Sequence, residues 1–370
     1  MSIQKLGMPK WGLSMTEGKV LEWLVDEGSE IAVGDEIAEV ETEKITGAVE
    51  SPAAGVLRRH VASPGDVIPV GGLLGVIAPA EVPDAEIDAF VEEFQASFVP
   101  GEAEEEAGGP SAETVDTPAG PVRVLVSGEG DEVLVLLHGF GGDAENWRFN
   151  LDSLADGRTV LAVDLPGHGS SSKQVGDAGA LVTAVTGVLD AREIDKAHLA
   201  GHSMGALVAA ELALGAPDRV QSLALVAPVG FGDEINGDYI EGFIAARTRK
   251  ELKPVLQLLF ADEGLVTRQL VDEVLRYKRL DGVEDALRSL QASLFPDGRQ
   301  QRVLAGDLER LDVPILVIWG EQDQVLSPAH AESAPGGARV EVLSGAGHSP
   351  HMEAAGEVNR LIDRFLTAAV

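Results

Sequence analysis

The residues Gly201-His-Ser-Met-Gly205 follow the G-x-S-x-G pattern, in which a serine hydroxyl acts as a nucleophile. An apolar run, residues 197–200, precedes the pattern, and a helix-favouring run of small residues, 206–214, follows it. The pattern requires a strained turn between a strand and a helix, and its two glycines leave room for that turn. A pentapeptide in an Ala/Gly-rich chain can also match by chance, so its surroundings decide. Here they favour Ser203 as a nucleophile.

An acid and a histidine should follow the serine in chain order. Asp323 ends a buried run that begins near residue 313, and His348 follows a short apolar strand and a glycine-flanked turn. We therefore predict that Asp323 orients the imidazole of His348, which takes the proton of Ser203. His351 is the competing base, but its position after Ser-Pro, at the start of the last helix, favours His348.

Two backbone N–H groups are predicted to stabilise the oxyanion, those of Phe140 and of Met204. Phe140 lies in His138-Gly-Phe-Gly-Gly142, directly after an apolar run. The segment 139–144 also fits a dinucleotide-binding fingerprint, with Asp164 as the acid that would bind a ribose. Asp164, however, continues directly into Leu165-Pro-Gly-His-Gly-Ser170, and the serine motif follows. This order favours the interpretation as a serine enzyme.

Buried runs that alternate with helix-like segments must position these groups. The runs are residues 133–137, 159–163, 197–200, 223–226 and 315–318. Such alternation indicates a parallel sheet covered by helices on both faces. With the motifs above, residues 119–370 resemble an α/β-hydrolase, and the resemblance implies the α/β-hydrolase fold with a helical lid at about 230–296.

Basic residues gather in the expected lid. They are Arg247, Arg249, Lys250, Lys253, Arg276, Lys278 and Arg279. Such a cluster would suit the phosphates of coenzyme A. A solvated helix face has the same composition, and the sequence alone favours that simpler interpretation.

An internal repeat organises residues 1–80. A shift of 37 positions places Gly18 on Gly55 and Gly28 on Gly65, with apolar positions in register between them. Each half consists of short strands separated by glycine turns, so two halves are expected to pair into a small all-β sandwich or flattened barrel. Lys44 lies between the halves, in Glu41-Thr-Glu-Lys-Ile45, on a predicted hairpin turn. Taken alone, it is an ordinary solvated lysine.

Residues 1–80 resemble the lipoyl domain of 2-oxo acid dehydrogenase-type acyltransferases. The resemblance rests on Met8-Pro9, Gly18, Gly28, Gly34-Asp35, Pro52-Ala-Ala-Gly55 and the segment around Lys44. It implies that Lys44 carries lipoic acid in amide linkage. Glu43 stands where the family usually has Asp. The similar biotinyl domain has Met on both sides of its lysine, so Glu43 and Ile45 favour lipoyl over biotin.

Residues 81–118 contain twelve acidic residues and no Lys or Arg. Apolar residues at helical spacing between positions 84 and 98 predict a short amphipathic helix, whose apolar face would dock on a neighbour or mediate self-association. Residues 100–118 are predicted to form an extended, solvated linker. Together they form an acidic helix and flexible linker, with no room for the small subunit-binding domain common in lipoyl acyltransferases.

The composition excludes several classes. A net charge of −33 disfavours nucleic acids and anionic membranes as partners. Without cysteine the chain has no disulfide, no thiol nucleophile and no Cys-bound metal, and we expect no metal at the site. The sequence contains neither an apolar run long enough for a transmembrane helix nor a signal-peptide pattern, so a cytoplasmic location is expected.

The pairing of the two domains resembles the dihydrolipoamide acetyltransferase (E2) components of acetoin dehydrogenase complexes. The resemblance implies transfer of an acetyl group from the lipoyl arm to coenzyme A. It also implies a thiamine diphosphate-dependent E1, a flavin-dependent E3, and acetoin catabolism as the setting; we further expect a homo-oligomer. Ordinary acyltransferases of this type use His-x-x-x-Asp, but none of the eight histidines has Asp four residues later. The transfer is therefore expected to proceed through an acyl-Ser203 intermediate.

Two alternatives remain at this point. The first is a lipoyl-linked thioesterase or esterase that transfers the acyl group to water, since the same three residues serve both reactions. The second is a lipoyl carrier and assembly scaffold whose hydrolase domain has lost its activity. The intact serine, acid and histidine set argues against the second.

Overall fold

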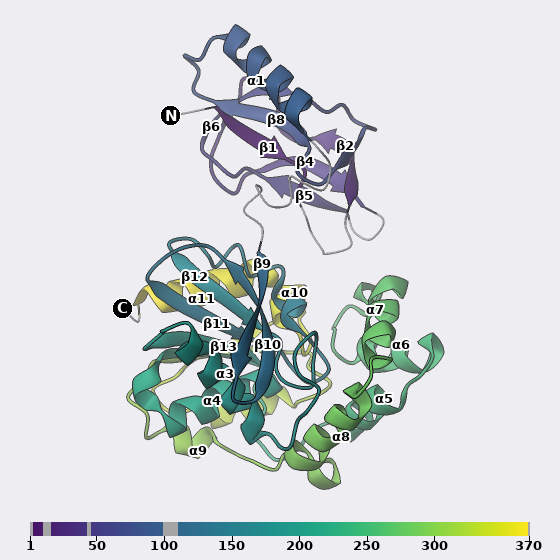
Figure 1. Cartoon of the computed structure of the whole chain (residues 1–370), viewed down its shortest axis with the longest axis vertical. Coiled ribbons are helices and arrows are strands. Elements are labelled where there is room, and N and C mark those ends of the chain that lie inside the picture. The colour runs from purple at the N-terminus through teal and green to yellow at the C-terminus, as the bar shows by residue number, and fades with distance from the viewer. Residues whose placement is uncertain (1–2, 10–15, 43–45, 99–109, 369–370) are drawn as a thin grey trace. The chain divides into compact units, whose positions relative to one another are not determined.

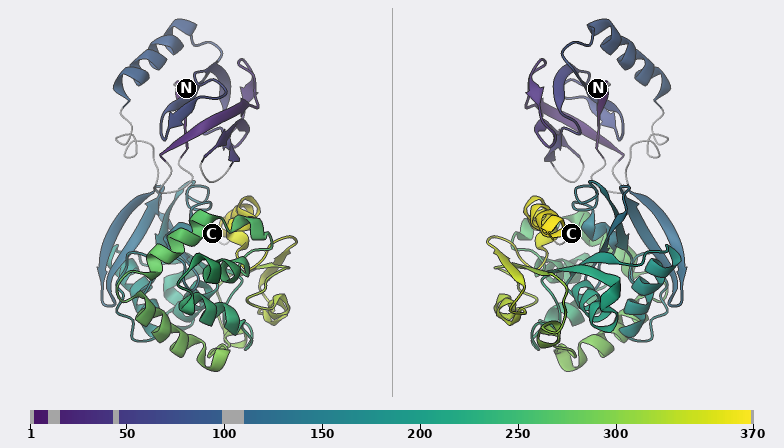
Figure 2. Two further views of the ribbon diagram at one scale, coloured as in Figure 1. Left: turned by 90° about the vertical axis from the view of Figure 1, so that its right-hand side faces the viewer. Right: turned by 90° about the vertical axis from the view of Figure 1, so that its left-hand side faces the viewer.

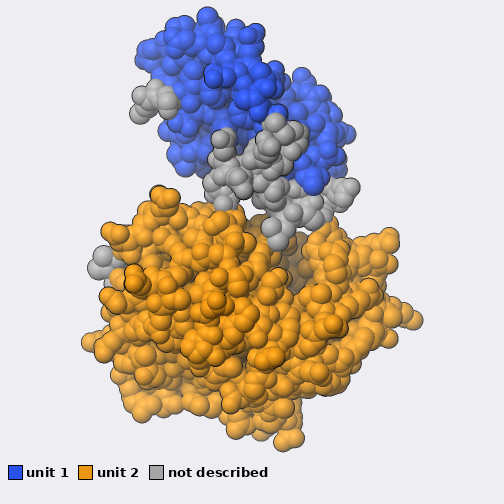
Figure 3. All heavy atoms as spheres, in the orientation of Figure 1, with its two compact units in different colours: residues 1–109 blue, residues 110–370 orange. Residues whose placement is uncertain are grey.

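A computed structural model describes residues 3–9, 16–42, 46–98 and 110–368 of the chain. It divides into two compact units, Met1–Gly109 and Pro110–Val370, which are coloured separately in Figure 3. Each unit has an apolar core of its own.

The first unit is a sandwich of two four-stranded antiparallel sheets, ordered β1-β8-β6-β3 and β5-β4-β2-β7 (Figure 1). The strands are β1 Gln4–Gly7, β2 Glu17–Trp23, β3 Glu30–Ile31, β4 Glu36–Glu41, β5 Thr46–Glu50, β6 Gly55–His60, β7 Val67–Pro69 and β8 Leu73–Ala78. The shift of 37 places β2 on β6 and β4 on β8, so each sheet contains strands from both halves of the repeat. The predicted all-β fold is confirmed.

The repeat extends to the core and to the turns. Val20 and Leu57, which the shift superposes, are both fully buried in the shared core. Gly28 and Gly65 have φ angles of 89° and 98°, a region that residues with a Cβ rarely adopt. Glycine is thus required at the same turn in both halves.

The predicted helix is α1, Asp84–Ser97. Its Ile87 is fully buried against Val76 of β8, so its apolar face packs on the first unit itself. Arg58 of β6 binds Asp84 at 2.8 Å and helps to hold the helix. The expected docking of this face is thus seen on the adjacent sheet of the same unit, and self-association through it stays a prediction.

The second unit is built on an eight-stranded sheet ordered β16-β15-β14-β13-β11-β12-β10-β9 (Figure 1). Six of its strands are parallel, as expected: β11 Glu132–Leu137, β12 Arg158–Val163, β13 Ala197–His202, β14 Val220–Val226, β15 Ile315–Gly320 and β16 Arg339–Leu343. All five predicted buried runs lie in these strands. Two antiparallel strands, β10 Gly120–Ser127 and β9 Ser111–Thr117, complete one edge.

The structure differs from the predicted linker, residues 81–118, and from the predicted start of the hydrolase at 119. Part of that linker forms strand β9 of the second unit. Residues 111–117 pair with β10 along its whole length and belong to the second unit. The apolar pattern of the sequence does not indicate this strand, because it is a polar edge strand in which Val115 is the single buried side chain. Its register comes from backbone hydrogen bonds to β10, which the apolar pattern does not report. The rest of the predicted linker, residues 100–109, lies outside the described residues.

Helices cover both faces of the large sheet. Alternate strand residues face opposite sides; Leu199 of β13 joins one apolar cluster and Ala200 the other. The first cluster includes α3 Gly179–Ala191 and α4 Met204–Gly215, and the second includes α11 Ala355–Ala368 and the 3-10 helix Ala144–Trp147. The sheet is thus buried on both sides, and its parallel strands end at a common edge.

A helical insertion follows β14 and returns to β15 (green in Figure 2). It comprises α5 Gly237–Ala245, α6 Arg249–Gln257, α7 Arg268–Lys278 and α8 Val283–Leu294. Thr248 begins α6 with a capping box that includes Glu251. Two short helices, α9 Ala305–Leu308 and α10 Pro350–Glu353, precede and follow the last strands. No helix within the described ranges has both the length and the apolar character needed to cross a membrane.

Candidate active site

Ser203 lies on the sharp turn between β13 and α4. Its φ of 53° and ψ of −112° are strained for a residue with a side chain. The turn is fixed by a 2.9 Å hydrogen bond from its N–H to the carbonyl of Val226. A Cβ on Gly205 would lie 2.3 Å from the carbonyl oxygen of Leu137, and one on Gly201 would lie 2.4 Å from the carbonyl oxygen of Gly205. Both glycines of the motif are therefore sterically required.

The structure brings the serine, the acid and the second histidine into one hydrogen-bonded chain. Oγ of Ser203 lies 3.0 Å from Nε2 of His348, and Nδ1 of His348 lies 2.8 Å from Oδ2 of Asp323. All three side chains are buried. With the His348 proton on Nδ1 donated to Asp323, Nε2 is free to accept the serine proton.

The carboxylate of Asp323 has four hydrogen-bond donors. Oδ1 accepts from the N–H groups of Val325 and Leu326 at 2.8 and 2.9 Å. Oδ2 accepts from His348 and also from the indole N–H of Trp319, at 3.0 Å. These donors fix the carboxylate in the plane that orients His348. Sequence reasoning missed Trp319, whose only signal is its place four residues before the acid.

Two backbone N–H groups beside the serine are free. Among the described residues, the N–H groups of Phe140 and Met204 donate to no acceptor. The carbonyl of Gly139 accepts from Nδ1 of His138 at 2.8 Å and from the N–H of Gly142 at 3.1 Å. In a trans peptide the C=O and N–H point in opposite directions, so these two bonds aim the N–H of Phe140 away from them.

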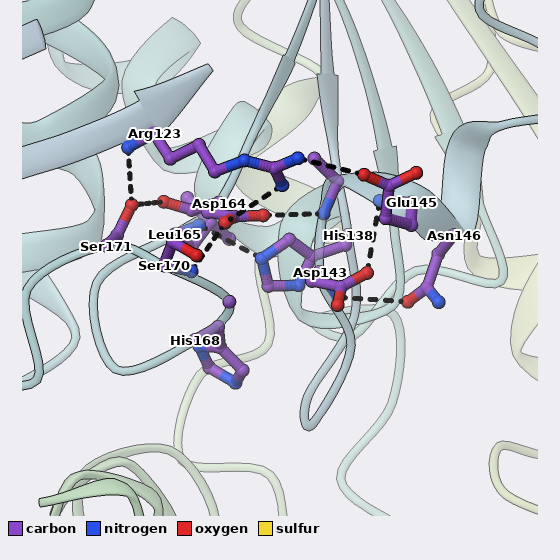
Figure 4. Close-up of polar contacts among 12 residues, drawn as sticks. Arg123, His138, Asp143, Glu145, Asn146, Asp164, Leu165, His168, Ser170 and Ser171 are labelled. Carbon is purple, nitrogen blue, oxygen red and sulfur yellow. Dashed lines mark hydrogen bonds and ion pairs between the residues drawn. The ribbon is translucent and has the colours of Figure 1, made fainter. Parts of the chain in front are cut away.

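Two buried histidines support this segment (Figure 4). Nε2 of His138 accepts from the N–H of Leu165 at 2.9 Å, and Nε2 of His168 accepts from the N–H of Gly141 at 3.1 Å. Burial lowers the pKa of His138 and holds the pKa of His168 well below its usual value. Both rings are therefore neutral, and each accepts at Nε2 with its proton on Nδ1.

Asp164 holds the same segment by further hydrogen bonds (Figure 4). Its fully buried carboxylate accepts from the N–H groups of Ala144 and Ser170 at 2.8 and 2.7 Å, and from Arg123 at 3.4 Å. Neighbouring Asp143 has its pKa raised to about 7, mainly by burial and then by the charge of Asp164. Asp164 therefore has a structural partner at each oxygen and no access to a ribose, which excludes the dinucleotide interpretation.

His351, the competing base, is fully buried, and the hydrogen bond to Oγ of Ser203 comes from His348 instead. Its ring packs on Trp147 and on His202, with centroid distances of 4.5 and 4.4 Å. Neither of its ring nitrogens has a hydrogen-bond partner in the described part of the chain. Burial, with a smaller effect from the charge of His348, lowers its pKa to about 3. The geometry therefore favours His348 as the base.

A pocket lies over the oxyanion segment. Its walls include Phe140 and His202 on one side and apolar side chains of the helical insertion on the other, among them Leu256, Leu270 and Val274. The phenol of Tyr239 on α5 donates to the carbonyl of Phe140 at 3.2 Å, joining the insertion to the oxyanion segment. An apolar chamber of this kind suits an uncharged acyl or thiol chain.

Glu353 joins the loop of His348 to the insertion, and sequence reasoning missed this residue as well. Its two carboxylate oxygens accept from the N–H of Gly347 and from the N–H of Ala261, both at 2.7 Å. The N–H of Ser349 adds a bond of 3.0 Å to the carbonyl of Leu259. The loop that carries the base His348 and the segment after α6 are thus held together through the carboxylate of Glu353.

Lys44 lies outside the described residues. The strands that precede and follow it, β4 and β5, pair in antiparallel register as far as Glu41 and Thr46. Lys44 is one of the four residues that connect these paired ends. The hairpin position of Lys44 itself stays a prediction.

Comparison with known proteins assigns a family to each unit and to the whole chain. Residues 132–355 match the α/β hydrolase fold family, and residues 4–77 match the family described as biotin-requiring enzyme. Over 363 residues, 97% of the chain, it is 52% identical to the dihydrolipoyllysine-residue acetyltransferase component of the acetoin cleaving system of Cupriavidus necator, 96% of which is covered. The protein of the same description from Pseudomonas putida is 48% identical, with 98% of each chain covered.

The chain belongs to this acetyltransferase family. The second unit is also similar in fold to solved structures of hydrolases. A meta-cleavage product hydrolase from Pseudomonas fluorescens is similar with a TM-score of 0.63 and 26% identity, over 70% of this chain and 98% of that one. The acetyltransferase family thus combines a lipoyl-type domain with a domain of hydrolase fold.

Proposed function

We propose that the protein transfers an acetyl group from a lipoyl thioester to coenzyme A in acetoin catabolism, through an acetyl ester on Ser203. The observation that carries the proposal is the chain Ser203–His348–Asp323 beside two unpaired N–H groups, those of Phe140 and Met204. The similarity to the acetoin-cleaving acetyltransferases over nearly the whole chain supports it.

Lys44 is the residue that would hold the lipoyl group, by an amide bond to Nζ. The proposal is supported by the position of Lys44 in the sequence, within the four residues between the paired ends of β4 and β5 at Glu41 and Thr46. When bound, the lipoyl group supplies a thiol that carries the acetyl group as a thioester. As an E2 component, the protein works with E1 and E3 components; we propose that these are thiamine diphosphate-dependent and flavin-dependent, respectively.

In the first half-reaction Ser203 attacks the thioester carbonyl. His348 Nε2 takes the hydroxyl proton as the bond from Oγ to the carbonyl carbon forms, and Asp323 stabilises the resulting imidazolium. The N–H groups of Phe140 and Met204 donate to the oxyanion. The carbon–sulfur bond then breaks, and His348 returns the proton to the departing thiolate.

In the second half-reaction His348 takes a proton from the thiol of coenzyme A. The sulfur attacks the acetyl carbon, the carbon–oxygen bond to Ser203 breaks, and His348 protonates Oγ. Atoms and charges balance without another reactant. Because water attacks the same ester, the apolar walls of the insertion have to limit its access.

The deciding experiment offers acetyl groups on the lipoylated protein, with and without coenzyme A, and measures acetyl-CoA and acetate. We expect acetyl-CoA as the main product and a loss of at least ~1,000-fold in Ser203→Ala. Ser289→Ala, in the insertion, is the matched control. Acetyl-CoA formation that survives Ser203→Ala would refute the covalent route, and rapid acetate release at saturating coenzyme A would favour a thioesterase.

A second experiment tests the lipoyl attachment site. Intact mass spectrometry compares the lipoyl modification of the Lys44→Arg variant with that of Lys19→Arg, the control.

A further inference from the structure

The helical insertion carries a local excess of positive charge. Residues 247–279 contain eight Lys/Arg and five Asp/Glu, a net charge of +3, in a chain whose net charge is −33. Coenzyme A carries several phosphate charges, so a chain this acidic repels it unless cations offset the field locally. A site for coenzyme A is therefore expected where this local excess of positive charge lies.

Two of these cations are occupied by structural contacts. Arg247 is paired with Glu284 of α8. Lys278 donates to the carbonyls of Phe243 and Ala246 at the end of α5. Neither cation is available to a ligand without breaking the packing of the insertion.

Two arginines contact a single carboxylate on the exposed side of α6 and α7, and a third, Arg276, follows that carboxylate by one helical turn on α7. Arg249 forms an ion pair with Asp272, and Arg268 lies 4.0 Å from the same side chain. The hydrogen bond from Arg249, followed by the charges of Arg249, Arg268 and Arg276, lowers the pKa of Asp272. One carboxylate neutralises one guanidinium, so two positive charges remain at this point. This arrangement suits an anion with several oxygens.

Lys250 and Lys253 add charge on α6. Both are exposed, and neither forms an ion pair with a carboxylate that the structure describes. Their spacing of three residues places them on one face of the helix. The outer side of α6 therefore carries unpaired charge next to the arginines around Asp272.

The same two helices line the pocket over the oxyanion segment. Leu256 of α6, with Leu270 and Val274 of α7, faces that pocket. The charged and apolar faces of α6 are separated by no more than one helix diameter, about 10 Å. A ligand that reaches the pocket with an uncharged arm can therefore place its anionic end on the outer face of the insertion.

We infer that Arg249, Arg268 and Arg276, with Lys250 and Lys253, bind the phosphates of coenzyme A while its thiol enters the pocket. The inference rests on the proposed function and extends it by naming where the acceptor binds. The chemistry matches: the arm of coenzyme A is long and uncharged, and its charges are gathered at the nucleotide end.

The test compares acceptors that differ in phosphate content. The double variant R268Q/R276Q keeps the ion pair between Arg249 and Asp272, and Arg310→Gln, an exposed arginine outside the insertion, is the control. With coenzyme A we expect the KM of the double variant to rise about tenfold with little change in kcat. With pantetheine, which lacks the nucleotide, we expect no change in KM. An unchanged KM for coenzyme A, or an equal rise for both acceptors, would overturn the inference.

A binding measurement separates this site from the proposed reaction. Calorimetry with adenosine 3′,5′-bisphosphate needs no acetyl transfer, and inorganic phosphate serves as the comparison. Binding of the bisphosphate, weakened about tenfold in R268Q/R276Q and unaffected in Arg310→Gln, supports the site even if wild-type protein transfers acetyl to no thiol. Equal binding by wild type and double variant, or no binding at all, contradicts it.

Discussion

The indole N–H of Trp319 donates to the same oxygen of Asp323 that accepts from His348. Trp319 and His348, the two donors to Oδ2, are 29 positions apart in the sequence, and both side chains are buried together with Asp323. Trp319 thus holds the carboxylate in the orientation that His348 needs.

Trp319→Phe should lower kcat for acetyl transfer by roughly 3- to 30-fold, because it removes one hydrogen bond to a charged group. Phenylalanine retains much of the packing. The matched control is Trp147→Phe, since Trp147 is also fully buried but its N–H has no partner among the described residues. Steady-state kinetics measure both variants, and equal losses would show that packing alone is responsible.

His138→Asn should reduce kcat about 10- to 100-fold with a small change in KM, because the Gly139 carbonyl loses its side-chain donor and the N–H of Phe140 is less well aimed. The control is His198→Asn, a buried histidine of β13 that bonds to Ser222. It should lose comparable stability and keep its kcat. If both variants retain wild-type kcat, the peptide orientation does not depend on His138.

Stability should fall with acid below pH 6.5, in part because of His351. Its pKa is about 3 in the folded protein and 6.5 in the reference state, so between these values the unfolded chain binds more protons. Stability is therefore fully present above pH 6.5 and is lost as pH falls, by about 1.4 kcal/mol per pH unit for this group. Urea unfolding between pH 4 and 8, followed by circular dichroism, should show a shallower acid slope in His351→Phe. An unchanged slope, equal to that of Trp147→Phe, would contradict this.

Gly205→Ala should destabilise the second unit by several kcal/mol, in the range of backbone strain and overpacking combined, about 3–5 kcal/mol. The added Cβ would meet the backbone carbonyl of Leu137 at 2.3 Å, and neither atom can move without disturbing the sheet. Gly215→Ala, at the other end of α4, meets nothing within 4 Å and should be neutral or slightly stabilising. Thermal unfolding distinguishes the two, and a stable Gly205→Ala would mean that the turn can rearrange.

The sequence predicts the parts of this fold that depend on local pattern. The five buried runs, the serine turn and the repeat of 37 residues follow from apolar spacing and glycine positions, and the structure has them where expected. Strand β9 could not be predicted, because its pairing depends on β10 and its own side chains are mostly polar.

The contacts that refine the site depend on distant parts of the chain. Glu353 joins Gly347 to Ala261, 92 positions away from the carboxylate in the sequence, and no local pattern indicates such a pair. Sequence motifs therefore predict Ser203, Asp323 and His348, whereas the further contacts of Trp319 and Glu353 are seen only in the folded chain.

The bonds of Glu353 also couple the opening of the helical insertion to the position of the general base, His348. Residues 259–261 cannot swing outward while Ala261 and Gly347 share that carboxylate, so an opening of the insertion would strain or displace the loop of His348. Solvent would then enter at the moment when the general base is out of place. In the open state an acyl ester on Ser203 would hydrolyse slowly because the general base, His348, is displaced. In the closed state it would hydrolyse slowly because water is excluded.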